Sequence, residues 1–206
     1  TSIWNGMMIV NNTLYTFSSD NTIKYSEIPI YEEPNLYNQK LKNEYYIKTG
    51  NISTYGNMII VNHQNTLVIN KKINTYFNNT FYSYVTPNDN YDCGIIFGLN
   101  NLDFSKLSKE KYFSFIINKE GYLILSKIIN GNSIEIIKKK CQDIYHEFDK
   151  RNTYKLSIYY LPHIGKIIAS VNENIVFDIF DNSLNNRYVG LESLGNGTIF
   201  SQILLE

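Results

Sequence analysis

Apolar and polar residues alternate along the C-terminal half of the chain. In the run 154–161, one alternating series is Leu156, Ile158 and Tyr160, and the other is Lys155, Ser157 and Tyr159. Successive side chains of a β-strand point to opposite faces, so this alternation predicts a strand with one buried face. A turn at Pro162-His163-Ile164-Gly165 follows it.

Short apolar runs of this kind cover most of the chain. They are separated by turn residues such as Asn130-Gly131, a strong hairpin signal. This arrangement is typical of a β-sandwich or barrel and not of alternating strands and helices. The predicted strands are 7–10, 14–17, 45–48, 58–61, 66–69, 81–85, 93–99, 111–118, 122–129, 133–138, 154–161, 166–171, 175–180, 188–193 and 199–205. One short helix is predicted over 141–151, where Ile144 and Phe148 are four residues apart and face inward.

The composition agrees with a single folded domain. Of 206 residues, 43% are hydrophobic and 18% charged, which allows a sizeable core and argues against disorder. We therefore predict one β-sandwich domain over residues 1–206. The first 50 residues are more polar, and they either complete the sandwich or form a peripheral extension.

Charge and hydropathy exclude two classes of partner. The formal net charge is zero, and the basic clusters Lys71-Lys72 and Lys138–Lys140 are short, so we expect no nucleic-acid binding. The longest apolar runs, such as 113–117, are too short to cross a bilayer. The chain begins at Thr1, from which we expect a processed or excised segment. The abundance of Asn, Ile, Lys and Tyr resembles coding from an AT-rich genome, for which we expect an apicomplexan parasite before a clostridium.

The order of the strands resembles a known pattern over about residues 58–206. Its pieces are Asn79-x-Phe81-x-Ser83-Tyr84-Val85, Asp92–Phe97, Tyr154-x-Leu156-x-Ile158, Lys166-Ile167-x-Ala169-x-Val171-Asn172, Val176-Phe177-Asp178, Tyr188–Ser193 and Thr198–Ser201. The series is similar to the concanavalin A-like lectin/glucanase superfamily, specifically its laminin-G-like members. The resemblance implies an all-β fold: an antiparallel two-sheet jelly-roll sandwich. Two positions depart from the pattern, because Glu173 stands where glycine is common and Tyr154 lies where tryptophan is usual.

The residues that catalysis needs are not arranged for it. Glucanases of this superfamily place acidic residues alternately on one strand so that their side chains share a face. The spacing of Glu147 and Asp149 fits two such acids, but both fall in the predicted helix, where a solvated face explains them better. The histidines, at 63, 146 and 163, suggest no nucleophile triad, so we predict that the chain is not an enzyme.

Three sets of residues are candidate binding or structural sites. Tyr82 and Tyr84 share one strand face and Tyr159 lies on a polar face, and exposed tyrosines suit sugar or protein ligands. Laminin-G-like modules often hold Ca²⁺ at a sandwich rim, and Asp89, Asn90 and Asp92 offer oxygen ligands for it, although an ordinary polar turn also explains them. Cys93 and Cys141 either form a disulfide or are two buried thiols.

These observations lead to one predicted function and two alternatives. The chain is expected to be a non-catalytic extracellular recognition or adhesion module of a larger secreted or cell-surface protein, with a protein or glycan as its ligand. The first alternative is a sugar-specific lectin. The second is a glycoside hydrolase, which two carboxylates about 5–10 Å apart in a groove would favour.

Overall fold

The computed structural model divides the chain into two compact units, Thr1–Leu36 and Tyr37–Glu206, each of which is described by itself. The structure describes residues 4–10, 13–18, 23–27, 43–74, 80–88, 92–99, 110–144, 149, 152–184 and 187–206. The prediction of a single domain over residues 1–206, with 1–50 inside the sandwich or at its edge, stays a prediction.

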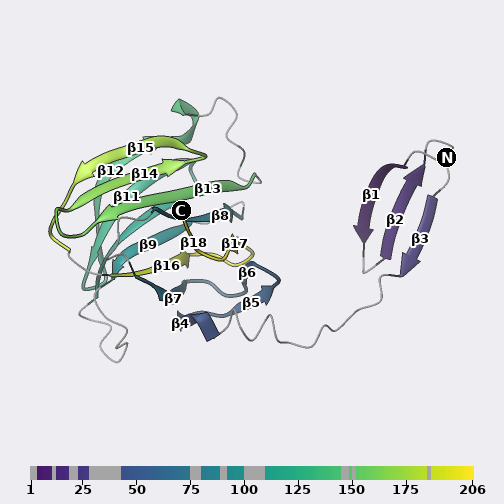
Figure 1. The fold of residues 1–206 in the computed structure, drawn as a ribbon, viewed down its shortest axis with the longest axis horizontal. Coiled ribbons are helices and arrows are strands. Elements are labelled where there is room, and N and C mark those ends of the chain that lie inside the picture. Colours follow the sequence, from purple (N-terminus) through teal and green to yellow (C-terminus); the bar gives the residue numbers. More distant parts are fainter. Residues whose placement is uncertain are drawn as a thin grey trace. The chain divides into compact units, whose positions relative to one another are not determined.

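The first unit contains a three-stranded antiparallel sheet in the order β1-β2-β3 (Figure 1). β1 (Trp4–Val10) pairs with β2 (Thr13–Ser18), and these two strands contain the predicted strands 7–10 and 14–17. β3 (Ile23–Glu27) was missed because its sequence, Ile-Lys-Tyr-Ser-Glu, contains only two strongly β-forming residues.

The larger unit is a sandwich of two antiparallel sheets (Figure 1). The seven-stranded sheet has the order β12-β11-β10-β9-β16-β7-β4, and the eight-stranded sheet has the order β15-β14-β13-β8-β17-β6-β5, with β18 also paired to β8. The strands of the first are β4 (Tyr45–Thr49), β7 (Thr66–Asn74), β9 (Cys93–Leu99), β10 (Lys111–Ile117), β11 (Tyr122–Ile129), β12 (Asn132–Lys140) and β16 (Tyr188–Ser193). The strands of the second are β5 (Ile52–Tyr55), β6 (Met58–Val61), β8 (Thr80–Thr86), β13 (Tyr154–Leu161), β14 (Lys166–Val171), β15 (Asn174–Phe180), β17 (Ile199–Ser201) and β18 (Leu204–Leu205).

The core lies between the two sheets and is built from the alternate side chains of both. Phe97 and Phe113 of the seven-stranded sheet stack with ring centroids 5.2 Å apart, and Tyr160 of the eight-stranded sheet packs edge-on to Phe97 at 5.2 Å. All three are fully buried, and the Tyr160 hydroxyl donates to the carbonyl of Leu184 at 2.5 Å. The alternation in 154–161 therefore works as predicted, because Leu156 and the apolar residues in step with it face the core. The remaining side chains form the outer face of each sheet.

Some sequence-based expectations for the larger unit differ from the structure. β5 was missed because Ile52 is the only aliphatic residue of this short edge strand. The predicted strand 199–205 is divided into β17 and β18, while the predicted strands 58–61 and 66–69 correspond to β6 and β7, which enter different sheets. The helix predicted over 141–151 is a 3-10 helix at its start, Cys141–Asp143; Ile144 packs against the core as expected, and 145–148 lie outside the described residues.

The architecture is thus an all-β, antiparallel jelly-roll sandwich, as predicted. Within the residues that the structure describes, no helix has both the length and the apolar character needed to span a membrane.

Candidate functional site

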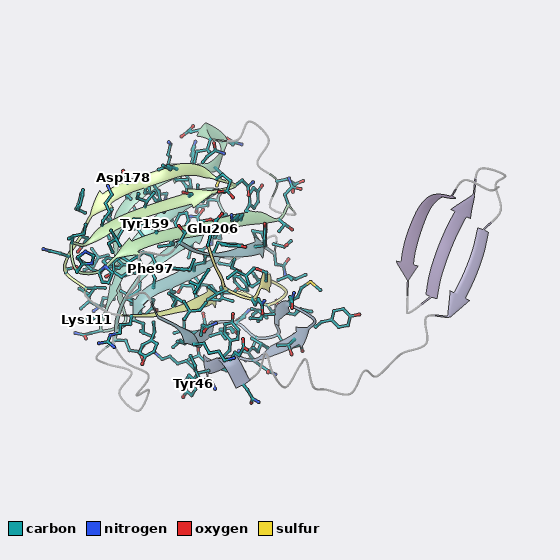
Figure 2. All side chains as sticks on the ribbon, viewed as in Figure 1. Tyr46, Phe97, Lys111, Tyr159, Asp178 and Glu206 are labelled. Carbon is teal, nitrogen blue, oxygen red and sulfur yellow. The ribbon has the colours of Figure 1, made fainter. Side chains whose placement is uncertain are left out.

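The three predicted tyrosines lie on the outer face of the eight-stranded sheet. Tyr82 and Tyr84 of β8 meet edge to face with ring centroids 5.9 Å apart, and 45% of Tyr84 is exposed. The Nζ atom of Lys155 lies 4.2 Å from the centre of the Tyr82 ring. Tyr159 of β13, labelled in Figure 2, pairs with Thr80 of β8 and so shares this face. The structure brings the three onto one surface, and their role in ligand binding stays a prediction.

The predicted calcium ligands fall mostly outside the described residues. Of Asp89, Asn90 and Asp92, only Asp92 is described, and one of its carboxylate oxygens accepts the backbone N–H of Lys119 at 3.0 Å. Within the described ranges no group of three or more His, Cys, Asp or Glu side chains could hold a metal ion. The calcium site therefore stays a prediction.

Cys93 and Cys141 do not form the disulfide that was one of two alternatives; both are buried free thiols. Cys93 begins β9 and Cys141 follows β12, three strand positions away in the sheet. At about 4.8 Å per strand this separation is about 14 Å, well beyond the roughly 7 Å Cα separation that a disulfide can span. Burial raises the pKa of both thiols to about 12, so they are unreactive near neutral pH.

A polar pair that sequence reasoning missed lies on the outer face of the seven-stranded sheet. Glu192 of β16 accepts a hydrogen bond from the hydroxyl of Ser114 of β10. The two strands are not neighbours, because β9 runs between them and places Gly94 opposite Glu192. Gly94 has no side chain, so the Glu192 side chain can cross over β9. A Cβ atom at Gly94 would also lie 2.1 Å from the carbonyl oxygen of Phe115, so glycine is required there.

The surroundings of this pair make the Glu192 carboxyl group a weaker acid than an exposed glutamate. Burial raises the pKa of Glu192 to about 7, the hydrogen bond from Ser114 opposes the rise, and the charge of Asp92 adds to it. Burial also raises the pKa of Tyr112, with a further contribution from Glu192. The Glu192 carboxyl group thus changes its charge near neutral pH.

The rest of this face combines hydroxyl, aromatic and aliphatic side chains. Ser126 of β11 pairs with Ser114 and is, like it, buried, with 6% and 3% of the two residues exposed. Half-buried Ile116 and Ile124 form the next pair of these two strands on the same face. At the neighbouring edge, the Nζ atom of Lys138 lies 4.1 Å from the ring centre of Tyr122.

This arrangement can hold a hydroxyl-rich ligand. The carboxyl and hydroxyl groups can donate and accept hydrogen bonds, and the tyrosine and isoleucine side chains can pack against C–H groups. The alternation in Val189-Gly190-Leu191-Glu192-Ser193 places Glu192 opposite to the core-facing residues, which is the one sequence signal for it. Its partner Ser114 is 78 residues away and could not be paired with it from sequence.

Comparisons with known proteins show what the chain resembles. Neither a protein-family model nor a curated protein sequence matches it. Carbohydrate binding module CBM66 from Bacillus subtilis is 15% identical over 79% of this chain and 95% of its own, with a TM-score of 0.59. The metal-free carbohydrate recognition domain of Emp46p is 10% identical over 85% and 95%, with a TM-score of 0.57. The Bacillus licheniformis β-glucanase is 9% identical over 78% and 90%, with a TM-score of 0.55.

These likenesses span recognition domains and an enzyme, and at such low identity what they share with this chain is the arrangement of strands. That arrangement matches the one implied by the strand order in the sequence. The chain therefore has the two-sheet β-sandwich fold of the concanavalin A-like lectins and glucanases.

Proposed function

We propose that this chain is a non-catalytic glycan-recognition module that binds sugar on the outer face of its seven-stranded sheet. The observation that carries the proposal is the Glu192–Ser114 pair, set among half-buried tyrosine and aliphatic side chains. Sugars present hydroxyls that form hydrogen bonds and C–H faces that pack on aromatic rings, and this face offers groups for both. Two structures of similar fold, named as a carbohydrate binding module and a carbohydrate recognition domain, support it.

We further propose that the module belongs to a larger secreted or cell-surface protein and serves in recognition or adhesion. A glycan is favoured over a protein as its ligand. The reason is that the hydrogen-bonding groups here are sunk among their neighbours, where the hydroxyls of a sugar can reach them more readily than a flat protein surface can.

A glycan array probed with the labelled chain at pH 8, where Glu192 is ionised, tests the proposal. We expect binding to a subset of glycans. Glu192→Gln should weaken it at least tenfold, because a hydrogen bond to a charged group contributes about 1.5–3 kcal/mol. Ser114→Ala should also weaken it, because Ser114 orients the carboxylate. Glu120→Gln, at an exposed turn, is the matched control and should bind like the wild type.

Two results would contradict the proposal. One is a wild-type chain that binds no glycan on the array, which would point to a protein ligand. The other is a Glu192→Gln variant that binds the same glycans with wild-type affinity, which would place recognition elsewhere on the sandwich.

Glycoside hydrolysis is a second candidate, favoured by Asp92 together with Glu192. Asp92 precedes β9 and is two residues from Gly94, so it shares the outer face with Glu192 on the neighbouring strand. A carboxyl group with a raised pKa suits a general acid, and hydrolysis needs a second carboxylate near it. Reducing ends released from β-glucan by the wild type, but not by Glu192→Gln or Asp92→Asn, would establish hydrolysis in place of recognition.

A further inference from the structure

A pocket of about 370 Å³ lies on the outer face of the eight-stranded sheet, on the opposite side of the sandwich from Glu192. Its volume falls within the roughly 300–1,000 Å³ of small-ligand sites. Ser157 and Tyr159, two residues apart on β13, both line it, as does Glu206, which Figure 2 labels together with Tyr159. The pocket is thus separate from the site of the proposed function.

Small side chains beside large ones create this pocket. Ser157 pairs with Tyr82 of β8 on one side and with Ser170 of β14 on the other. Two residues along β13, Tyr159 pairs with Ile168 of β14. The two serines therefore form a low floor that carries hydroxyl groups, and Tyr159 and Ile168 form an apolar wall next to it.

The hydroxyl group of Ser157 points to a ligand. Only 5% of Ser157 is exposed, and its Oγ atom is buried with no hydrogen-bond partner among the described residues. A buried hydroxyl without a partner is costly to the folded state, and native structures rarely keep one without a reason. A bound ligand that donates to or accepts from Ser157 would remove this cost.

The rim of the pocket carries negative charge. Glu173 and Glu206 both line it, and none of the described lining residues is cationic. Lys155, beside the pocket, pairs with both carboxylates, at 2.6 Å to Glu173 and 3.2 Å to Glu206. One lysine against two carboxylates leaves one negative charge unbalanced, which favours a ligand with a positive charge.

Glu173 keeps its place at the rim despite an unfavourable backbone conformation. It follows Asn172 in the turn between β14 and β15, and the φ angle is 45° at Asn172 and 69° at Glu173. A two-residue hairpin turn of this kind requires positive φ at both of its positions, and this left-handed region favours glycine. The departure from the glycine that is common here thus places a carboxylate at the pocket.

We infer that the pocket is a second binding site whose ligand is an amino sugar with a free ammonium group. The ammonium group lies at the rim, where the charges of Glu173 and Glu206 together exceed the single positive charge of Lys155. The sugar hydroxyls reach Ser157 and Ser170 on the floor, and the C–H face of the ring packs on Tyr159.

Isothermal titration of the chain with glucosamine at pH 6, where such an amine is protonated, tests the inference. Glucosamine should bind at least tenfold more tightly than glucose, which lacks the charge, and than cyclohexylamine, which lacks the hydroxyls. Ser157→Ala should weaken glucosamine binding about tenfold, corresponding to a difference of about 1.4 kcal/mol. Glu206→Gln should weaken it to a similar extent.

The Glu173→Gly variant distinguishes binding lost with the carboxylate from binding lost through misfolding. This change removes the carboxylate and also relieves the backbone strain, so the variant should fold at least as well as the wild type while losing affinity. Glu135→Gln, an exposed glutamate on β12 of the other sheet, is the matched control and should keep wild-type affinity. Equal binding of the three small molecules, no binding of glucosamine at millimolar concentration, or unchanged affinity in Ser157→Ala would each overturn the inference. Because Glu192 lies on the other face, Glu192→Gln should leave glucosamine binding unchanged, so the two sites can fail independently.

Discussion

The pKa of Glu192 predicts how the stability of the folded chain changes with pH. Burial raises this pKa from 4.5 to about 7 in the folded state, so the folded chain holds the proton more tightly than the unfolded chain. The stability that the tighter proton binding contributes to the folded state is fully present below pH 4.5, and it is lost as the pH rises through about 7. The difference of about 2.5 pKa units corresponds to about 3 kcal/mol, at about 1.36 kcal/mol per unit.

Urea denaturation followed by far-UV circular dichroism at pH 4.5 and pH 8.5 measures this effect. The ionisation of Glu192 should lower the wild-type free energy of unfolding by about 3 kcal/mol between pH 4.5 and pH 8.5. Glu192→Gln cannot ionise, so it should lose that part of the pH dependence, while Glu120→Gln should keep it. An unchanged pH dependence in Glu192→Gln would refute the assignment of a raised pKa to this carboxyl group.

Three further predictions concern packing. Gly94→Ala should lower the free energy of unfolding by about 3 kcal/mol in urea denaturation, because the new Cβ meets the carbonyl oxygen of Phe115; full wild-type stability would contradict the close approach. Phe97→Ala should lower it by about 3–5 kcal/mol by the same measurement, because the ring is fully buried between the sheets; a loss below 1 kcal/mol would place Phe97 outside the core. Cys93 and Cys141 should react with iodoacetamide only after denaturation, as intact mass shows, since burial raises the pKa of both thiols; rapid labelling of the folded chain would contradict their burial.

The sequence predicted most strands and the fold class because the underlying signals are local. β11 and β13 begin and end where predicted, since each is a long run of β-forming residues bounded by turn residues. The sheet that a strand joins is not a local property: β6 and β7 are separated by four residues, yet they enter different sheets. Only the backbone pairing between strands in the folded structure shows which strands are neighbours.

The candidate sites were predictable to different extents for the same reason. Tyr82 and Tyr84 are two residues apart on one strand, so the sequence alone places them on a common face. The Glu192–Ser114 pair requires the order β16-β9-β10 and the alignment of Gly94 with Glu192, both of which depend on contacts between residues far apart in the chain. The charge of Glu173 was visible in the sequence, but its position at a pocket was not.

The positions of β16 and β17 have a consequence for how the molecule assembles. β16 lies between β9 and β7, and β17 lies between β8 and β6, so in each sheet a strand from the C-terminal end joins the early strands to the middle of the chain. The strands β4, β5, β6 and β7 therefore cannot pair with the rest of the sandwich until residues 188–201 have left the ribosome. Such long-range pairing is slow. We therefore expect a nascent chain that stops before Tyr188 to hold two unjoined groups of strands with exposed edges, and to depend on chaperones until residues 188–201 have been synthesised.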